Sequence, residues 1–478
     1  MENVRLKCEA KGIKFVGGVG PYNAKIVIVG EALGVEEEKQ EIPFCGGAGR
    51  LLNFILKRAR VSREDCFITN VVKVRPPQNK VERLSEIGLT VSEFVPLLKE
   101  ELQEIKPSVV LALGETAFEV LTSLKPISKW RGSIVESSLV PKLKVIGTYH
   151  PAAVLWAFYG GEIAKESLKK KAKQIRVLIE LDVKRMREES ETAEINVPKR
   201  RLFISPSLNE VHALLDGLSS YLDFDIKKIA VDIEVDSSGL ISCLGLSCDP
   251  EYALCIPFRK GYSSYWSEGE EDIIWRWLEE LFHSKHLFIF QNALFDLMWL
   301  VPKVGYFPVY MDTMWAAQLL YAELPKDLGT LASIYTREPY YKDERKVWKD
   351  ATITEQLWSY NAKDAAVTLE VALRLEEELE QARQGDFFFG FVMQLLPVLL
   401  KMQMRGIRVD QRVREDIRRQ LVESKSQLEK ELGNLNVRSP KQMKQFLYEE
   451  LKLPKQYKKK TKQITTDKEA LLKLRKKV

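Results

Sequence analysis

Short apolar runs that alternate with helical stretches fill most of this chain, and this alternation limits its fold most strongly. The run KIVIV at 25–29 ends at a glycine, and Leu51–Ala59 then has helical spacing. Further strand-like runs occur at Phe67–Val72, Ser108–Leu113 and Lys144–Thr148, and a helical pattern at 115–124. Strand and helix alternating in this way predict a parallel sheet with helices on both faces, a three-layer α/β/α domain.

A second α/β unit follows a charged stretch that contains Pro198. Ile163–Glu189 has helical spacing, and we place a linker at 186–200. Three adjoining strands of a meander are predicted at Lys228–Val235, Ser242–Ser247 and Tyr252–Phe258. A helix at Asp272–Phe282 and a strand at His286–Gln291 come next. The expected organisation is α/β multidomain, with domains at 1–185, 201–384 and a helical segment at 385–478.

Composition supports a globular protein with real cores, since 45% of the 478 residues are hydrophobic. The longest apolar stretch, Phe387–Leu400, is too short to span a bilayer and contains Gln394 and Pro397. The N-terminus lacks the apolar core of a signal peptide. Six cysteines form no Cys-x-x-Cys pair and indicate reduced thiols. We therefore expect a cytoplasmic protein with no membrane partner.

Positive charge is concentrated at the C-terminal end. Residues 399–478 hold 23 Lys and Arg against 10 Asp and Glu, a net charge of +13 within a total of +6, so the residues before them carry −7. A basic end on an acidic body favours a polyanionic partner, and nucleic acid is the expected one. A solvated lysine-rich helix face is the alternative.

Four carboxylates in the second unit stand at positions that metal chemistry would use. Asp232 and Glu234 are two residues apart on a predicted strand and share a face. Asp296 follows the strand HLFIFQ, and Asp364 follows Tyr360 by one helical turn. Acids from separate elements are the hard oxygen ligands that two divalent cations need for phosphodiester cleavage.

The segments VDIEVDSSG, FQNALFDLMWL and YNAKDAAVTLEV, in this order, resemble the three exonuclease motifs of the proofreading domain in family A DNA polymerases, in the variant with a tyrosine. The resemblance implies an RNase H-like fold and a two-metal site holding Mg²⁺ or Mn²⁺. It implies that the four acids are ligands, that Tyr360 orients the attacking water, and that Asn292 supports the second motif or touches the DNA strand. The family often has Thr where Ile233 stands.

The first unit carries another ordered series: GEALGVEEEKQEIPFCGGAGRLL (30–52), ITNVVKVRPPQNK (68–80), LGETAFEVL (113–121), WRG (130–132) and TYHPAAVL (148–155). This series resembles the uracil-DNA glycosylase superfamily, most closely its family 4. The resemblance implies that Phe44 stacks on a flipped base, Asn70 hydrogen-bonds its edge, and His150 stabilises charge developing on uracil. Glu31 and Glu37 match acidic positions near the attacking water.

Two departures from the family stand out. Leu33 replaces the proline of GEAPG. The family binds an iron–sulfur cluster through four cysteines, whereas here only Cys8 falls near such a position and Val74 replaces the cysteine before RPP. We therefore expect no iron–sulfur cluster. An active glycosylase pocket and a decayed one that only binds DNA or a replication partner both remain open.

The C-terminal segments LLPVLLKMQMRGIRVD (395–410), NVRSPKQMKQFLYEELKLP (436–454) and KKTKQITTDKEALLKL (459–474) resemble the start of the polymerase thumb in family A enzymes. Ser439 is expected to cap a helix that begins at Pro440. Phosphate contacts are expected from Lys458, Lys459, Lys460 and Lys462. The palm carboxylates and the fingers helix have no counterpart, so we expect no nucleotide addition by these residues alone.

These observations favour a DNA replication protein: the N-terminal part of a phage or bacterial family A DNA polymerase with 3′-to-5′ exonuclease activity on single-stranded ends. Its partners would be primer–template DNA and a separately encoded palm and fingers part or other replication proteins. One alternative is a non-catalytic subunit that positions DNA for a separate polymerase. Another is a repair enzyme that excises uracil.

Overall fold

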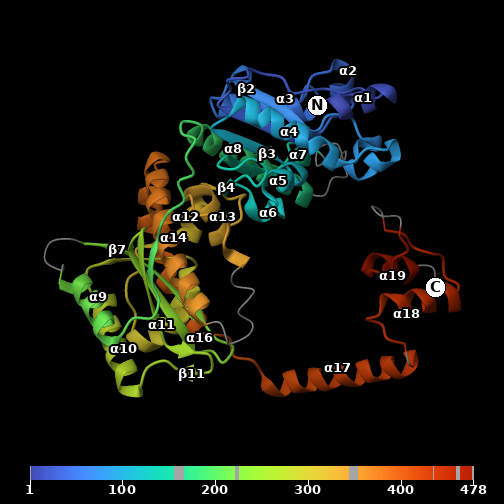
Figure 1. Cartoon of the computed structure of the whole chain (residues 1–478). Coiled ribbons are helices and arrows are strands. Elements are labelled where there is room, and N and C mark those ends of the chain that lie inside the picture. Colours follow the sequence, from blue (N-terminus) through green and yellow to red (C-terminus); the bar gives the residue numbers. More distant parts are fainter. Residues whose placement is uncertain are drawn as a thin grey trace. The chain divides into compact units, whose positions relative to one another are not determined.

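The computed structural model describes residues 2–155, 166–220, 226–343, 354–433, 435–458 and 463–475. The chain divides into a compact unit at Met1–Met404 and a second unit at Arg405–Val478 (Figure 1). The first unit contains two large sheets, each packed against apolar cores, and one small two-stranded sheet.

The N-terminal domain is built on a five-stranded sheet in the order β2-β1-β3-β5-β4. Its strands are β1 (Ile26–Ala32), β2 (Cys66–Val72), β3 (Val109–Leu113), β4 (Ile134–Glu136) and β5 (Lys144–Thr148). The four predicted strands pair in parallel, with Gly30 opposite Asn70. The antiparallel edge strand β4 is absent from the sequence prediction, because three residues give no readable alternation.

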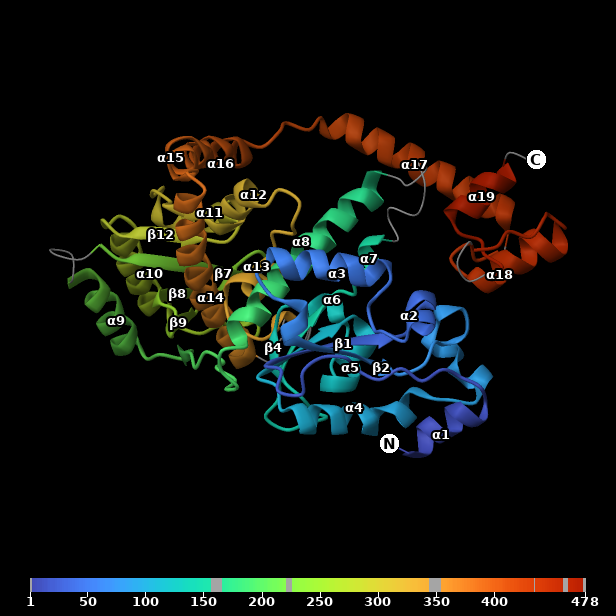
Figure 2. The same ribbon diagram turned by 90° about the horizontal axis from the view of Figure 1, so that it is seen from above.

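Helices cover both faces of this sheet, which confirms the predicted three-layer fold (Figure 2). Successive residues of β1 point to opposite faces, so Val27 and Val29 belong to one core and Ile26 and Ile28 to the other. The first core is covered by α4 (Val91–Ile105) and α5 (Glu115–Thr122), and the second by α3 (Gly47–Arg58) and α8 (Glu166–Glu189). The smaller helices are α1 (Glu2–Ala10), α2 (Val35–Gln40), α6 (Ile127–Trp130) and α7 (Ala152–Leu155).

Helix α8 continues into the stretch predicted as the linker 186–200. Met186 is fully buried in the core under the sheet, and Glu189 is 4% exposed. The Lys144 ammonium donates to Glu189 Oε2 at 2.8 Å, which fixes the end of the helix to β5. The irregular connection to the next domain therefore begins after Glu189.

The second domain contains a mixed six-stranded sheet in the order β13-β12-β7-β8-β9-β6. Its strands are β6 (Arg201–Phe203), β7 (Lys228–Val235), β8 (Ile241–Asp249), β9 (Tyr252–Pro257), β12 (Leu287–Phe290) and β13 (Met311–Asp312). The antiparallel pairs β7–β8 and β8–β9 confirm the predicted meander. A small hairpin joins β10 (Arg259–Lys260) to β11 (Ser263–Ser264).

Two layers of helices flank this sheet, the arrangement of an RNase H-like domain. On one face α14 (Thr354–Gln381) packs Trp358 and Ala362 against Cys243 and Cys255. The large core on the other face involves α9 (Leu208–Ser220), α10 (Glu268–Phe282), α11 (Ala293–Val304), α12 (Thr313–Leu320) and α13 (Leu328–Tyr335). Helix α10 begins at a capping box, in which Ser267 accepts from the Glu270 amide.

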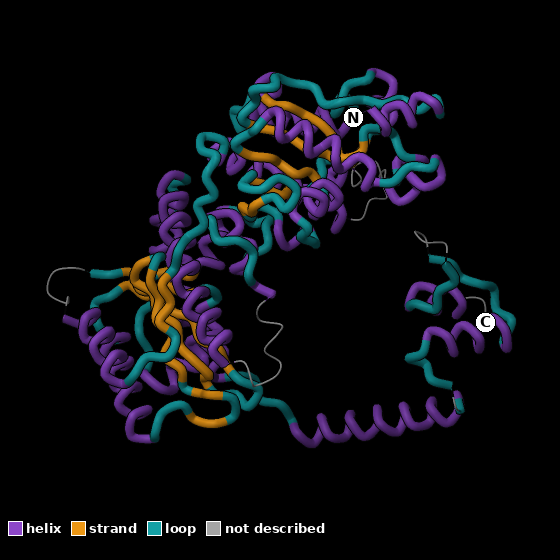
Figure 3. The backbone as a smooth tube through the Cα atoms, viewed as in Figure 1, coloured by secondary structure: helices purple, strands orange, loops and turns teal. Residues whose placement is uncertain are grey.

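The remaining chain is mainly helical (Figure 3). Helices α15 (Gly385–Phe387) and α16 (Leu396–Arg405) belong to one helical run, Gly385–Arg405, that is long and apolar enough by length and composition to cross a membrane. The run exceeds the stretch noted in the sequence, and it buries Phe388, Met393 and Leu400 in the core of the second domain. The second unit holds α17 (Gln411–Leu432), α18 (Pro440–Gln445) and α19 (Lys468–Arg475), and Ser439 caps α18 as predicted.

Candidate functional site

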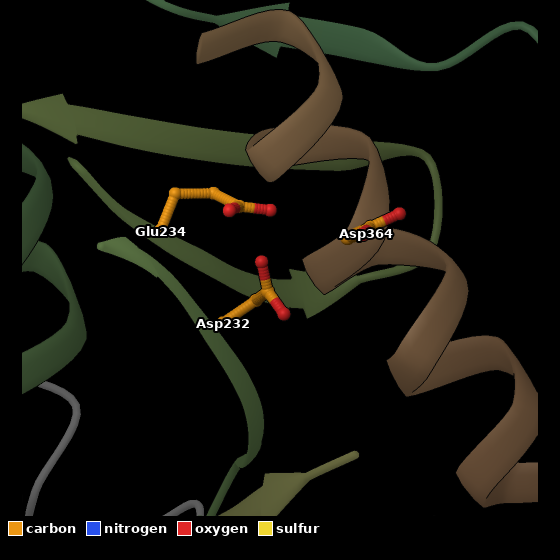
Figure 4. Close-up of side chains that lie close together, drawn as sticks. All are labelled: Asp232, Glu234 and Asp364. Atoms are coloured by element: carbon orange, nitrogen blue, oxygen red, sulfur yellow. The ribbon is translucent and has the colours of Figure 1, made fainter. Parts of the chain in front are cut away.

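Three of the four predicted metal ligands come together on the second sheet. Asp232 and Glu234 project from one face of β7, while Ile233 between them points into the core and is 3% exposed. Asp364 comes from α14, which packs over β7 and β8. Carboxylate oxygens of these three acids lie within 4.8 Å of one another (Figure 4). We call Asp232, Glu234 and Asp364 the acid cluster.

The fourth acid, Asp296, lies beside the acid cluster in the first turn of α11. It is 3% exposed, and its Oδ1 accepts a hydrogen bond from the Ile233 amide at 3.1 Å. This amide lies between the two acids of β7, so the contact places the fourth carboxylate next to them. All four predicted acids are therefore gathered at one place from three separate elements.

The electrostatics of this place favour a bound cation. Burial raises the pKa of Asp232 well above its usual value, and the charges of Asp364, Asp296 and Glu234 raise it further. Burial also raises the pKa of Asp296. Like charges held together away from water are costly unless a cation balances them. Carboxylate oxygens are the ligands that Mg²⁺ and Mn²⁺ prefer, so these residues fit such ions.

A tyrosine and a lysine that the sequence prediction missed hold Asp364. The Lys342 ammonium donates to Asp364 Oδ1 at 2.7 Å and to Oδ2 at 2.6 Å, and the Tyr341 hydroxyl donates to Oδ1 at 2.6 Å. Lys342 also donates to the Tyr360 hydroxyl at 2.9 Å. Tyr360 itself is 2% exposed and lies one turn before Asp364, as predicted from its spacing. The sequence contains no periodicity that links residues 341 and 342 to Asp364.

Asn361 is a second residue that sequence reasoning missed. Its side-chain amide donates to Asp232 Oδ2 at 2.8 Å and to the Asp232 carbonyl at 3.0 Å. It is fully buried, so it cannot exchange these bonds for water. The only signal in the sequence is its place next to Tyr360 in the third motif.

Asn292 stands at the start of α11, in the left-handed region with φ of 67°. Its side chain is exposed, and its backbone amide donates to Asp312 Oδ1 at 3.2 Å. The next amide, of Ala293, donates to Asp312 Oδ2 at 2.8 Å. Burial raises the pKa of Asp312 to about 6. Asp312 thus fixes the turn of α11 from which Asp296 projects.

A cavity of about 490 Å³ opens at the carboxyl ends of the strands of the N-terminal sheet. The cavity lining includes all the residues predicted for a base pocket, namely Glu31, Glu37, Phe44, Asn70 and His150. Leu33, at the position of the missing proline, also lines the cavity and is 2% exposed. Ligands commonly bind at this edge of a parallel sheet.

His150 is held in one tautomer. Its Nδ1 accepts a hydrogen bond from the Ala152 amide at 3.1 Å. Burial lowers the pKa of His150 to about 4, so the ring is neutral at pH 7. A neutral imidazole that accepts at Nδ1 carries its proton on Nε2. The ring can therefore donate one hydrogen bond from Nε2.

The side-chain oxygen of Asn70 is a hydrogen-bond acceptor that receives no hydrogen bond within the part of the chain that the structure describes. It is 3% exposed, and its Oδ1 has no hydrogen-bond partner among the described residues. A Cβ at Gly30 would lie 2.4 Å from this oxygen and 2.4 Å from Phe44 Cζ, so only glycine fits there. Phe44 lies 5.7 Å from the His150 ring between centroids. An aromatic face, an unused acceptor and a donor thus line one cavity.

The two glutamates of the cavity differ in their surroundings. Burial raises the pKa of Glu31, although Thr116 donates to its Oε2 at 3.1 Å. Glu37 accepts from the Gly46 amide at 3.0 Å. Burial therefore disposes Glu31 to take up a proton.

Apolar packing fills the region around Cys8 and Val74, where the resemblance noted in the sequence would place an iron–sulfur cluster. Cys8 and Val74 are both fully buried, and they share one core with Phe94 and Leu97 of α4. Burial raises the pKa of the Cys8 thiol, which disfavours a ligating thiolate. These residues do not fit a four-thiolate iron–sulfur cluster.

Of the four lysines predicted to contact DNA, Lys458 is described and is exposed. Its amide donates to the Gln463 carbonyl at 2.9 Å, next to the bridge between Tyr457 and Ile464. Lys459, Lys460 and Lys462 lie outside the described residues.

Comparison with known proteins matches both domains. Residues 17–177 match the uracil DNA glycosylase superfamily, and residues 218–380 match a 3′-5′ exonuclease family. A type-4 uracil-DNA glycosylase of Archaeoglobus fulgidus is 39% identical over 31% of this chain and 77% of its own length. The DNA polymerase of Bacillus phage SP01 is 23% identical over 84% of this chain and 45% of its own length. DNA polymerase I of Synechocystis is 28% identical over 56% of this chain and 29% of its own.

Proposed function

Because the chain belongs to the uracil-DNA glycosylase superfamily through its N-terminal domain and carries the 3′-5′ exonuclease domain of DNA polymerase I-like proteins, we propose that it removes nucleotides from single-stranded 3′ ends during DNA replication. The observation that carries this proposal is the acid cluster, with Asp296 beside it. Two Mg²⁺ or Mn²⁺ ions would be held by Asp232, Glu234, Asp296 and Asp364. Such ions supply an activated water and neutralise charge on the scissile phosphate.

The protein's own residues orient the reactants. Tyr360 is buried beside Asp364, and its hydroxyl accepts a hydrogen bond from the Lys342 ammonium. Its role is to position the attacking water by a hydrogen bond rather than to remove a proton. Asn361 and the Ile233 amide fix the carboxylates of Asp232 and Asp296.

The test follows the shortening, from its 3′ end, of a single-stranded DNA that carries a label at its 5′ end, with and without Mg²⁺. We expect Asp232→Ala combined with Glu234→Ala to abolish shortening of the strand. Glu280→Ala, on the exposed side of α10, is the matched control and keeps the activity. Unchanged degradation by the double variant would favour a non-catalytic subunit that positions DNA for a separate polymerase.

A second function, uracil excision, is favoured by the unpartnered acceptor of Asn70 in the cavity. In this proposal Phe44 stacks on the flipped base and Asn70 Oδ1 accepts from its N3–H. The bond between the base and C1′ breaks, and the Nε2 proton of His150 stabilises the negative charge left on uracil. The water oxygen bonds to C1′, and its proton passes to Glu31.

Uracil release leaves an abasic site that alkali cleaves. We expect alkali-labile sites in a uracil-containing duplex, lost in Asn70→Ala and in His150→Ala. A protein that prefers uracil-containing DNA over thymine DNA without releasing the base would have a sensing pocket rather than a catalytic one. Equal affinity for both DNAs would refute uracil recognition altogether.

The second unit extends this proposal to duplex DNA. Lys458 and its neighbouring lysines would contact phosphates of the primer–template in a sequence-independent way. A polymerase palm and fingers part, or another replication protein, would be the partner. The place of action would be the cytoplasm of a bacterial cell or of a phage-infected host.

A further inference from the structure

The two domains of the first unit meet next to the exonuclease site. Residues 340–343, which we call the bridging segment, lie between α13 and α14 in the sequence. Two of its side chains, Tyr341 and Lys342, contact Asp364. Tyr341 is 6% exposed, so this part of the segment is packed inside the protein.

The other residues of the bridging segment are held by the N-terminal domain. The Tyr340 amide donates to Ser133 Oγ at 3.2 Å, and Lys129 pairs with Asp343 Oδ2 at 2.5 Å. The Tyr340 ring lies edge-on to Trp130, with centroids 5.6 Å apart. Residues on both sides of Tyr341 and Lys342 are thus fixed by 129–133, which lie in and just after α6 of the glycosylase-like domain.

One buried ion pair and two hydrogen bonds hold this anchor in place. Arg131 is 4% exposed and pairs with Asp182 of α8, which is 1% exposed. Arg131 Nη1 also donates across the domain boundary to Ser333 Oγ at 2.8 Å. Arg185 of α8 donates to the Gly132 carbonyl at 2.6 Å. A buried pair of this kind strongly resists separation, since breaking it would leave an uncompensated charge.

The bridging segment is also held from its own domain. Arg200 pairs with Glu338 at 2.9 Å and with Glu370 of α14 at 2.6 Å. These contacts fix the chain two residues before Tyr340. Within the bridging segment, the Tyr340 amide and the Asp343 carboxylate are the groups that bond to the N-terminal domain.

We propose that Tyr341 and Lys342 are positioning residues of the exonuclease site, and that the glycosylase-like domain holds them against Asp364, so that the exonuclease reaction depends on this domain. The inference rests on the proposed exonuclease function. Tyr341 and Lys342 both donate to Asp364 Oδ1, which fixes the orientation of the carboxylate. Partners that orient a ligand in this way typically change metal affinity or activity by about 10- to 100-fold when they are lost.

The first test measures amide hydrogen exchange in the bridging segment of the full chain, in the absence of metal. The anchor variant combines Lys129→Ala with Ser133→Ala, and Lys125→Ala is the matched control, because Lys125 pairs with Glu119 at the surface of the same domain. Hydrogen exchange of a peptide covering 338–343 is followed by mass spectrometry in EDTA. We expect faster exchange in the anchor variant only. Equal protection in all three proteins would overturn the proposed anchoring.

The second test asks whether the anchor acts through the bridging segment. We expect the kcat of strand degradation to fall about 10-fold or more in the anchor variant and in Tyr341→Phe with Lys342→Met. We expect the kcat of a protein that carries both sets of changes to be no lower than the smaller of the two separate kcat values, because both sets disrupt the same interaction with Asp364. Lys342→Arg retains most of the rate. The proposal would be overturned if the two fold-losses in kcat multiplied in the combined variant, as independent effects do, or if the anchor variant had an unchanged kcat.

Failure of this inference is separable from failure of the proposed function. A chain that degrades DNA, loses this activity in Asp232→Ala with Glu234→Ala, and keeps it in the anchor variant has an exonuclease that does not depend on its neighbour. A chain whose nuclease activity survives the double acid variant contradicts the proposed function, whatever the exchange of the segment shows.

Discussion

The neutral state of His150 makes a quantitative prediction about stability. The ring has a pKa of about 4 in the folded protein, against an ordinary value of 6.5. The unfolded chain therefore binds a proton below pH 6.5 that the folded chain refuses. Stability associated with this residue is fully present above pH 6.5 and is lost as the pH falls from 6.5 towards 4.

The size of the effect follows from the two pKa values. The difference in proton binding destabilises the folded state by about 0.2 kcal/mol at pH 7 and by about 2 kcal/mol at pH 5. Other acidic groups also titrate in this range, so the effect of His150 is obtained by comparison with a variant. His150→Asn keeps an acceptor for the Ala152 amide and has no titrating ring.

The assay is urea denaturation at pH 7 and pH 5, with each transition fitted separately because a chain of several domains need not unfold in one step. We expect wild type to lose about 2 kcal/mol more than His150→Asn between the two pH values. His212→Asn, an exposed histidine of α9, is the control and follows wild type. An equal loss in wild type and His150→Asn would refute a His150 ring that stays neutral because its pKa is lowered.

Three further outcomes are expected. Asn361→Ala removes two hydrogen bonds to Asp232 and lowers the kcat of strand degradation by about 10- to 100-fold with little change in KM. Single-turnover and steady-state kinetics measure both quantities. A rise in KM as large as the fall in kcat would contradict a purely orienting role. Gly30→Ala places a methyl group 2.4 Å from Asn70 Oδ1, so it destabilises the domain by about 1–3 kcal/mol in denaturation experiments and abolishes preference for uracil-containing DNA. Replacing Lys458 and its neighbouring lysines by Gln reduces the dependence of primer–template affinity on salt by about one unit of slope per lost phosphate contact, and an unchanged slope would show that they do not contact DNA.

The sequence alone predicts the elements whose patterns are strong. Lys228–Val235 is a strand with the predicted bounds, and the acids at its second half share a face because side chains alternate along it. The short edge strand β4 was not predicted, and although the helical pattern ends at Glu189 as α8 does, the packing of the last turn of α8 into the N-terminal domain was not predicted either. Three residues are too few for alternation, and Glu189, the last residue of α8, is buried where it pairs with Lys144, a contact that no local pattern shows.

The residues of the candidate sites also divide into those that the sequence predicts and those that it does not. Residues within a motif, such as Tyr360 and Asp364, are one helical turn apart and can be placed together from spacing alone. Lys342 and Tyr341 reach Asp364 from a different segment, and Asn361 bonds to a strand more than a hundred residues earlier. Such contacts depend on how α14 and the two sheets pack, which no local pattern in one sequence encodes.

The apolar surroundings of Cys8 and Val74 affect how this protein can be made and stored. At this place the N-terminal domain gains its stability from the burial of apolar side chains. Unlike a metal cluster, this packing cannot be lost to oxidation by air or to a chelator. We therefore expect its folding to need no iron, so that bacteria grown in iron-depleted medium yield the same colourless, fully folded chain.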